Sequence, residues 1–374
     1  MNNIKKIIAL LSAFILIFLS VIPVFAEEKT YKQGDIIEFG SYPQSLVSDK
    51  TLINKLNKST KKWSSYEYNY DSSATKENYM QYSDVCVDGE NYRAVKMSKY
   101  RTSSQEYLNS SFDNNDSGNT TFKIELNTVY WFKYEPILWQ VLDPETGFVI
   151  SKNIIDCQPF SISLTYDFAN SDIRTWLNTT FKNTAFEKNN EEHILLSYLD
   201  NNADPIEYLS TPCSEKIFLI SKNEAAYLTG NMSDEGIFED YTAPEITDYA
   251  LIQGALPEQG FLTRTPHYDG CITQINTGGH SDHTNIDFAG YGICPAMHIN
   301  LETFNKTIQY GDIDNNGKLS AADARLTLRA AVGLETFSDE LIKIADVNKN
   351  GRIESADARL ILRAAVGLED PSTW

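Results

Sequence analysis

The chain has 374 residues, of which 42% are apolar and 22% are charged, and 51 acidic residues outnumber 32 lysines and arginines. The formal net charge of −19 at pH 7 argues against nucleic acid or anionic membranes as partners and favours solubility. The length leaves room for one sizeable domain, or two, beside smaller modules.

Residues 1–26 have the pattern of a secretory signal peptide. Lys5 and Lys6 give a basic start, residues 7–25 are apolar, and Val24-Phe25-Ala26 places small residues at the cleavage site. Cleavage leaves 30 basic and 51 acidic residues, a net charge of −21. We therefore predict a secreted chain with no membrane attachment after cleavage. The alternative is an uncleaved anchor, because the apolar run approaches spanning length.

Residues 27–303 contain short strands and helices, which predicts an α+β domain. Ile36–Gln44 reads as a strand that ends in a proline turn. Residues 60–125 are polar and rich in tyrosine, as in long surface loops or an insertion. Apolar runs that favour β structure follow at 128–142, 148–155 and 216–221.

Helical spacing appears in the second half of this domain. Residues 170–181 are predicted as a helix capped by Ser171, since their apolar residues recur at helical spacing. Shorter helices are expected at 222–228 and 247–255. Among the aromatic residues of these segments, core packing is expected for Trp139, Trp176, Tyr249 and Phe261.

The five cysteines are odd in number and widely spaced, and no C-x-x-C pair suggests zinc or thiol exchange. Up to two disulfides are compatible with the sequence, and so are five buried thiols. The residues are Cys86, Cys157, Cys213, Cys271 and Cys294.

A series of short ordered motifs covers residues 31–301. They are Phe39–Gln44, Pro136–Leu142, Ser171–Asn178, Phe218–Ser221, Thr247–Ala250, Phe261–Pro266 and Cys294–Ala296. The series resembles a family of secreted bacterial domains with no assigned function. That resemblance implies a distant similarity to the C-type-lectin-like fold of formylglycine-generating enzymes. Cys294 stands where the family's closing motif has arginine.

No sequence signature assigns catalysis to this domain. The closely spaced catalytic cysteines of formylglycine-generating enzymes are not matched, because Cys271 and Cys294 lie 23 residues apart. A polar cluster of His280, Asp282 and His283 could ligate a metal or supply a base, but a solvated glycine-rich loop is the favoured interpretation. A glycosidase would need two carboxylates across a cleft, and with 51 acids in the chain a candidate pair is no evidence.

Two twelve-residue segments near the C-terminus are near copies. The copies begin at Asp312 and Asp346. When they are extended to Glu335 and Glu369, 16 of the 24 aligned positions are identical. Oxygen-bearing side chains recur at loop positions 1, 3, 5, 9 and 12, with glycine at position 6. Calcium takes roughly six to eight oxygen ligands from alternating positions of a tight loop, so the spacing predicts two EF-hand-like calcium sites.

The predicted ligands comprise side-chain oxygens and, at position 7 of each loop, a backbone carbonyl. In the first loop they are Asp312, Asp314, Asn316, the Lys318 carbonyl, Ser320 and Asp323. In the second loop they are Asp346, Asn348, Asn350, the Arg352 carbonyl, Glu354 and Asp357.

The two copies depart from a sensor EF-hand in two ways. Position 12 is aspartate rather than glutamate, and residues 299–311 show no entering amphipathic helix. A loop followed only by its exiting helix, repeated twice, resembles a type I dockerin domain over 310–374. The resemblance implies a small all-α domain built from two calcium loop-helix repeats. The alternatives are a free-standing calcium buffer and a tetratricopeptide pair, whose signature residues are missing.

The dockerin resemblance implies two bound calcium ions and a cohesin module as partner, on a scaffold or cell surface. The contact positions implied are the end of each loop and the following helix. They correspond to Ala321, Ala322, Arg325, Arg329, Ser355, Ala356, Arg359 and Arg363. Because the copies are so similar, we predict a pseudo-two-fold domain that docks in either of two orientations. We also expect Tyr310, Pro371 and Trp374 to join the two ends of the domain, with a frayed C-terminus as the alternative.

Two functions therefore remain for the whole chain. The favoured hypothesis is an extracellular dockerin protein of a cellulosome-like or cell-surface complex that displays a non-catalytic binding domain, with a glycan as a candidate ligand. The alternative is an O-glycosyl hydrolase-like subunit of a polysaccharide-degrading complex.

Overall fold

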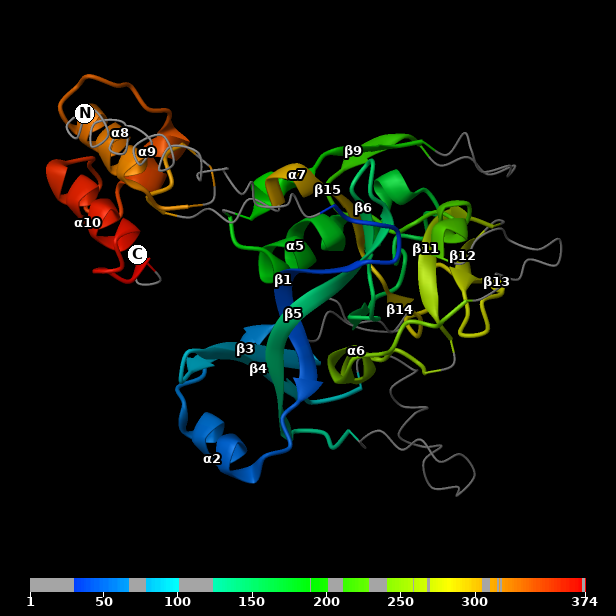
Figure 1. Cartoon of the computed structure of the whole chain (residues 1–374). Helices are drawn as coiled ribbons and strands as arrows, with labels where there is room; N and C mark the ends of the chain where they lie inside the picture. Colours follow the sequence, from blue (N-terminus) through cyan, green and yellow to red (C-terminus); the bar gives the residue numbers. More distant parts are fainter. Residues whose placement is uncertain are drawn as a thin grey trace, which may run out of the picture. The chain divides into compact units, whose positions relative to one another are not determined.

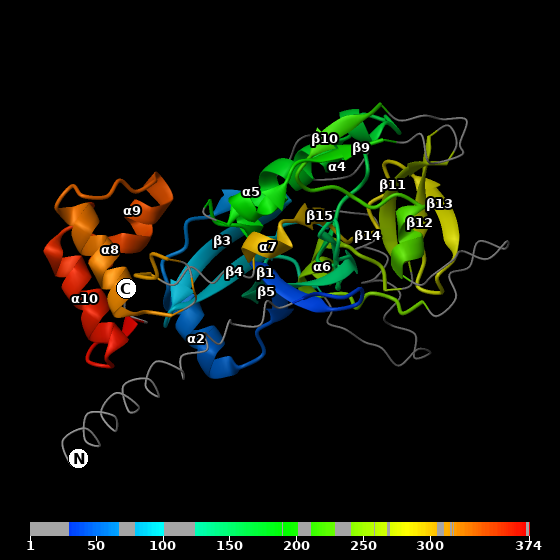
Figure 2. The ribbon, with the colours of Figure 1, turned by 45° about the horizontal axis from the view of Figure 1, so that its top comes forward.

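The computed structural model describes residues 30–66, 79–100, 124–188, 190–200, 211–228, 241–257, 259–267, 270–304, 310–314, 316, 318–371 and 374. The described chain forms two compact units, residues 31–301 and a C-terminal unit from residue 302 to 374 (Figures 1 and 2). The first unit is rich in β-structure and carries short helices, and the second is helical, which confirms the expected fold classes. The signal peptide lies outside the described residues.

The largest sheet of the first unit has eight described strands. Its order is β2-β3-β4-β5-β6-β15-β8, and β1 also pairs with β5. The strands are β1 (Ile36–Leu46), β2 (Ser64–Ser65), β3 (Met80–Val87), β4 (Glu90–Met97), β5 (Val129–Asp143), β6 (Phe148–Ser151), β8 (Ile194–Leu195) and β15 (Ala296–Ile299).

A second sheet of five described strands has the order β13-β12-β11-β14-β7. A separate pair joins β9 (Ser197–Leu199) to β10 (Cys213–Glu215). The strands of the second sheet are β7 (Asp156–Cys157), β11 (Phe261–Pro266), β12 (Cys271–Ile275), β13 (Ser281–Asn285) and β14 (Gly292–Ile293).

The long strand β5 organises the core of the first unit. It pairs antiparallel with β1, β4 and β6. Its Trp131 packs with Leu56 of helix α2 (Lys50–Lys58), and its Trp139 donates a hydrogen bond of 2.7 Å to the Phe39 carbonyl of β1. The four aromatic residues expected in the core, Trp139, Trp176, Tyr249 and Phe261, are each fully buried, which confirms their packing role.

Short helices cover the sheets. The predicted helix over 170–181 is present as α4 (Asp172–Trp176), a π turn at Leu177–Phe181 and α5 (Lys182–Ala185), and Ser171 caps its start as expected. Helix α6 (Asp248–Gln253) is capped by Thr247, and α7 (Leu301–Phe304) ends the described part of this region. No described helix has the length and apolar character needed to cross a membrane.

Two expectations for this unit are wrong. Residues 60–125 are not all surface loop, because β3 and β4 form an antiparallel hairpin that extends the main sheet, and Tyr66 and Tyr79 are buried. The apolar run 216–221 is buried but forms no strand, since only a single bridge joins Phe218 to Ala296. Burial, not strand pairing, accounts for the apolar character of that run.

The C-terminal unit contains helices α8 (Ala321–Ala331), α9 (Asp339–Ala345) and α10 (Ser355–Ala365). Ala324, Val347 and Ile361 form its small core, and Trp374 packs against them. A Cβ placed on Gly311 would lie 3.0 Å from the Trp374 ring, so the last residue meets the first turn of the unit. Trp374 is therefore not frayed, whereas Tyr310 instead lies under Lys349, whose Nζ is 5.3 Å from the ring centroid.

Gly40 allows β1 to approach the end of α5 closely. It has φ of +70°, and it lies in a register shift between β1 and β5. A Cβ at this position would lie 2.6 Å from both the Ala185 carbonyl oxygen and the Phe186 ring. Only glycine accommodates both the left-handed backbone and this contact.

We predict that Gly40→Ala destabilises the first unit by roughly 1–3 kcal/mol more than Gly34→Ala does, because only Gly40 faces a steric clash. Gly34 is a matched control, since it also has positive φ (+90°) but a Cβ added to it would meet nothing within 4 Å. Urea unfolding of both variants measures the difference. Equal losses of stability would contradict the packing role of Gly40.

Candidate functional site

The first repeat loop brings three carboxylates together. Oxygens of Asp312, Asp314 and Asp323 lie within 4.8 Å of one another. The backbone folds around them, because Asn316 N donates to Asp312 Oδ1 at 3.1 Å and Ile313 N donates to Asp323 Oδ1 at 2.9 Å. Such a cluster of hard oxygen atoms is suited to a calcium ion.

The electrostatics of this loop favour a cation. Desolvation, together with the nearby charges of Asp323 and Asp312, raises the pKa of Asp314. Mutual repulsion of this kind is relieved when a divalent ion binds between the carboxylates. The residues present therefore fit calcium.

The second loop repeats the same hydrogen bonds. Asn350 N donates to Asp346 Oδ1 at 3.0 Å, as Asn316 N does to Asp312 Oδ1. Asn348 N donates to Asp357 Oδ1 at 3.2 Å, as Asp314 N does to Asp323 Oδ1 at 3.2 Å. Gly351 has φ of +84° and donates its N–H to Asp346 Oδ2 at 2.7 Å. Burial raises the pKa of Asp357, the counterpart of Asp323. Gly317, the glycine of the first loop, lies outside the described residues.

The aspartate at loop position 12 also starts the exiting helix. Asp323 and Asp357 are fully buried, and each completes a capping box with the residue at position 9, Ser320 or Glu354. Ser320 N donates to Asp323 at 2.9 Å and Glu354 N donates to Asp357 at 2.9 Å. Loop and helix are thereby joined through one side chain in each repeat.

The exposed faces of the two repeats match. Arg325, Arg329, Arg359 and Arg363 are all exposed, and Arg329 and Arg363 form equivalent ion pairs with Glu335 at 2.8 Å and Glu369 at 3.0 Å. Ala321 and Ser355 are exposed, while Ala322 and Ala356 are half-buried. The four arginines therefore present the same chemistry in both copies, whereas Ala321 is replaced by Ser355 in the second copy.

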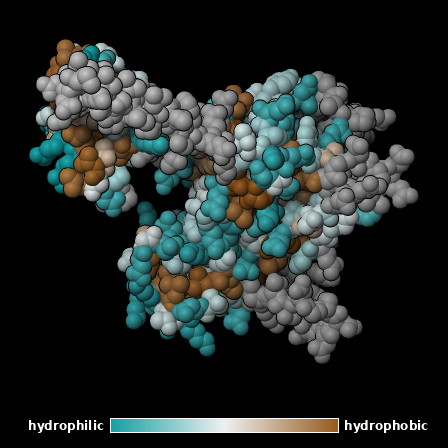
Figure 3. Space-filling view, in the orientation of Figure 1, coloured by the Kyte–Doolittle hydropathy of each residue, from teal (hydrophilic) through white to brown (hydrophobic). Residues whose placement is uncertain are grey.

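Sequence reasoning missed a duplicated apolar surface. Leu328, Val332 and Leu334 are 44%, 61% and 65% exposed, and Leu362, Val366 and Leu368 are 45%, 63% and 65% exposed. These residues lie at the same repeat positions, and apolar residues are visible on the surface of α10 (Figure 3). The sequence could have indicated this surface, because these three apolar residues are identical in both copies of the repeat.

The histidine cluster is exposed to solvent, as expected, but Asp282 and His283 lie on strand β13 rather than in a loop. His280, Asp282 and His283 are all exposed. The Nδ1 atom of His283 lies 3.2 Å from Oδ1 of Asp282, and the ring of His267 stacks on that of His283 with centroids 4.5 Å apart. In the described part of the chain, the metal-compatible group of carboxylates and imidazoles is the one in the first repeat loop.

None of the five cysteines, all of which lie in the described residues, forms a disulfide. Cys157, Cys271 and Cys294 are buried, Cys213 is half-buried and Cys86 is exposed. Burial raises the pKa of Cys294 to about 12. A thiol of this kind is a poor nucleophile, so Cys294 does not resemble a reactive catalytic cysteine.

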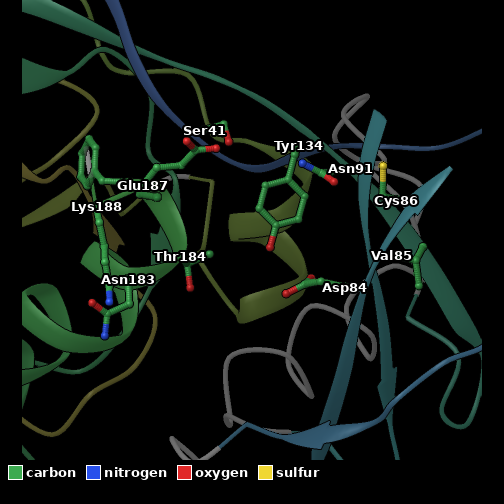
Figure 4. A pocket seen from close by; sticks show the side chains of 12 residues that line it. Ser41, Asp84, Val85, Cys86, Asn91, Tyr134, Asn183, Thr184, Glu187 and Lys188 are labelled. Atoms are coloured by element: carbon green, nitrogen blue, oxygen red, sulfur yellow. The ribbon is translucent and has the colours of Figure 1, made fainter. Parts of the chain in front are cut away.

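The first unit contains an open groove with a mixed polar and apolar lining and a volume of about 600 Å³. One wall comes from β1, β3, β4 and β5, and the other from the end of α5 and the residues after it (Figure 4). The lining residues are Ser41, Asp84, Val85, Cys86, Asn91, Tyr134, Asn183, Thr184, Ala185, Phe186, Glu187 and Lys188.

A buried arginine supports one side of this groove. Arg93 donates to both oxygens of Asp84, at 2.7 and 2.8 Å, and to Tyr249 Oη at 3.2 Å. Its guanidinium lies 4.5 Å from the ring centroid of Tyr82 and 5.5 Å from that of Tyr134. Asp84 is thus committed to an ion pair rather than to proton transfer.

The repeated loop-helix unit defines a class of calcium-binding module. Residues 310–364 match the dockerin type I domain, so the chain carries a C-terminal type I dockerin domain. Dockerin domains of this type bind calcium and dock to cohesin modules in cellulosome-type assemblies, typically outside the cell or at its surface.

Residues 145–301 match a domain of unknown function, DUF6273, which places this segment in an uncharacterised family. The chain has no significant match among curated proteins or solved structures. The C-type-lectin-like fold and the domain limits at 27–303 and 310–374 remain predictions.

We predict that a chelator lowers the thermal unfolding midpoint of the dockerin domain and that added calcium restores it. Each ion contributes about 2.7 kcal/mol when free calcium is about a hundredfold above its Kd. Calorimetry of the full chain with EDTA and with calcium measures the effect. An unchanged transition in EDTA would show that the loops do not depend on a cation.

Proposed function

We propose that this protein is a secreted, calcium-binding dockerin subunit that attaches to cohesin modules of a cellulosome-like or cell-surface scaffold. It displays residues 27–303 as a non-catalytic binding domain. The observation that carries this proposal is the duplicated loop-helix unit, whose two copies match in loop hydrogen bonds, helix caps and exposed residues. The signal-peptide pattern of residues 1–26 supports export.

Two calcium ions bind in this proposal, one in each repeat. The close carboxylates of the first loop and the equivalent hydrogen bonds of the second support equal roles for both. The first ion is held by Asp312, Asp314, Asn316, the Lys318 carbonyl, Ser320 and Asp323. The second is held by Asp346, Asn348, Asn350, the Arg352 carbonyl, Glu354 and Asp357.

Cohesin contacts the exposed face of either repeat. The basic positions Arg325 and Arg329, with Ala321 and Ala322, are matched by Arg359, Arg363, Ser355 and Ala356 in the other copy. The apolar residues beside them, Leu328 and Leu362, add surface that is costly to leave in water. This internal symmetry supports two docking orientations related by a half-turn.

A binding role for the first unit is supported by its groove. Asp84 accepts hydrogen bonds from Nε and Nη2 of Arg93, which engages its carboxylate. Burial makes the Cys294 thiol a poor nucleophile. The acidic chain disfavours nucleic acid as a partner. A glycan is the proposed ligand class, delivered to a polysaccharide-degrading complex whose other subunits perform the chemistry.

We predict that the two docking faces substitute for each other. Leu328→Ser/Arg329→Ser and Leu362→Ser/Arg363→Ser should each retain calcium-dependent binding to a cohesin, with an affinity loss of about twofold, because one orientation remains. The combined variant should lose about 100-fold or more, since several contacts of roughly 1 kcal/mol or more disappear from both faces. Surface plasmon resonance against a panel of type I cohesins measures both.

Calcium removal provides the control for this experiment. EDTA should abolish binding of the unaltered chain, and calcium should restore it. Absence of binding to every cohesin by a folded, calcium-loaded chain would contradict the proposal. Complete loss in only one single-face variant would reject the two-orientation arrangement while leaving cohesin docking in place.

A second candidate function is glycoside hydrolysis, with Glu187 as the exposed groove carboxylate that lies outside the ion pair of Arg93 with Asp84. Incubation of the full chain with plant and host polysaccharides, followed by measurement of reducing ends, tests it. Release that disappears in Glu187→Gln would establish an O-glycosyl hydrolase. No release by the folded chain would favour the binding subunit.

A further inference from the structure

The groove of the first unit is lined on both walls by groups that form hydrogen bonds. Asn91 and Asn183 contribute exposed amides from opposite sides, and Ser41 and Thr184 contribute hydroxyls. Figure 4 shows the Tyr134 hydroxyl directed into the space between Asp84 and Thr184. Amides, hydroxyls and carboxylates can donate or accept across the full width of the groove.

The groove is fixed in shape before any ligand arrives. The clamp from buried Arg93 holds Asp84, and the close contact at Gly40 holds β1 against Ala185 and Phe186. Burial raises the pKa of Tyr134, and its neutral hydroxyl is held by a hydrogen bond with Asp84, which leaves the hydroxyl oxygen as an acceptor. Such preorganisation reduces the entropy lost on binding.

The balance of charge along the groove indicates an uncharged ligand. Asp84 is neutralised by Arg93, and Glu187 is followed directly by Lys188, so neither sign predominates. The net charge of −19 for the whole chain repels a polyanion. A cationic ligand would find no unpaired group of carboxylates in the described lining.

We propose that this groove binds a short stretch of a neutral carbohydrate chain. The inference rests on the binding role proposed for this unit, and it names the site and the ligand class. A neutral sugar presents many hydroxyls, each able to donate and accept, which matches a lining of amides, hydroxyls and carboxylates. The groove volume of about 600 Å³ lies within the usual range of small-ligand sites, and its open form accommodates a chain that continues past the site.

The site is recognised by hydrogen bonds rather than by an exposed aromatic platform. Phe186 is buried, and the Tyr134 ring is half-buried beside the guanidinium of Arg93. Asn91 and Asn183 should therefore contribute to affinity, and both are exposed and can be replaced without disturbing the core.

Calorimetric titration of the full chain with cellohexaose, xylohexaose and mannohexaose tests the proposal. At least one should bind. The double variant Asn91→Ala/Asn183→Ala should weaken binding about tenfold or more, and Tyr134→Phe should weaken it about three- to tenfold, because each hydrogen bond contributes about that factor. Asn285→Ala is the matched control, since this exposed asparagine lies on β13 in the other sheet, and it should bind as the unaltered chain does.

Cys86 offers a second measurement at the site itself. It is an exposed thiol in the groove lining, whereas Cys213 is half-buried and outside the groove. At a sugar concentration about ten times Kd, alkylation of Cys86 by iodoacetamide should slow about tenfold, because about one site in ten stays free. The alkylation rate of Cys213 should be unchanged.

Three results would overturn the proposal. The first is a folded chain that binds none of the neutral probes. The second is binding of polygalacturonate or a chitosan oligomer in their place. The third is neutral-sugar binding that Asn91→Ala/Asn183→Ala leaves as strong as Asn285→Ala does, or that leaves Cys86 unprotected.

Docking and sugar binding can fail separately. Asp323→Asn/Asp357→Asn should lose calcium-dependent cohesin binding and retain sugar binding, because the substitutions lie in the dockerin loops. The groove variants should retain cohesin binding. Loss of sugar binding alone therefore rejects the groove assignment, and loss of cohesin binding alone rejects the docking proposal.

Discussion

Repulsion between closely spaced carboxylates, two buried and one exposed, is the constraint on which the dockerin domain depends. Asp312, Asp314 and Asp323 lie within 4.8 Å of one another, and the described core beneath them is only a handful of residues. A domain of this size buries too little apolar surface to hold like charges together alone, so metal binding and folding are linked. The same loops cap α8 and α10 through Asp323 and Asp357, and the helices that present the docking surface are therefore ordered by the loops.

In the first unit, a single cation has a comparable organising role. Arg93 is buried, and it connects Asp84 at the surface with Tyr249 in the core. Burial raises the pKa of Tyr249 to about 12, so the arginine is surrounded by neutral aromatic rings apart from its one carboxylate partner. A buried charge with these partners fixes both side chains in position, which explains how an irregular domain maintains a defined groove.

The sequence was most informative where one repeat could be compared with another. Position-by-position identity located the calcium loops and the helix after each, and the Ser171 cap located the start of a helix in the first unit. The groove could not be predicted, because Asn91 of β4 and Asn183 of α5 line opposite walls of one groove only in the folded domain. The β3–β4 hairpin was missed because its polar and tyrosine-rich strands resemble loops, although Tyr79 and Arg93 are buried. The family match begins at residue 145, so it covers only one wall of the groove.

The contact between Trp374 and Gly311 has a mechanical consequence. Tension from the rest of the chain enters the dockerin domain immediately before Tyr310, and Gly311 N is anchored by a 2.8 Å hydrogen bond to the Ile344 carbonyl. Trp374 packs beside that point and against the core, so a pulling force must shear this contact before it can peel away the first calcium loop. The two ends of the dockerin domain thus reinforce each other against a force applied through the chain.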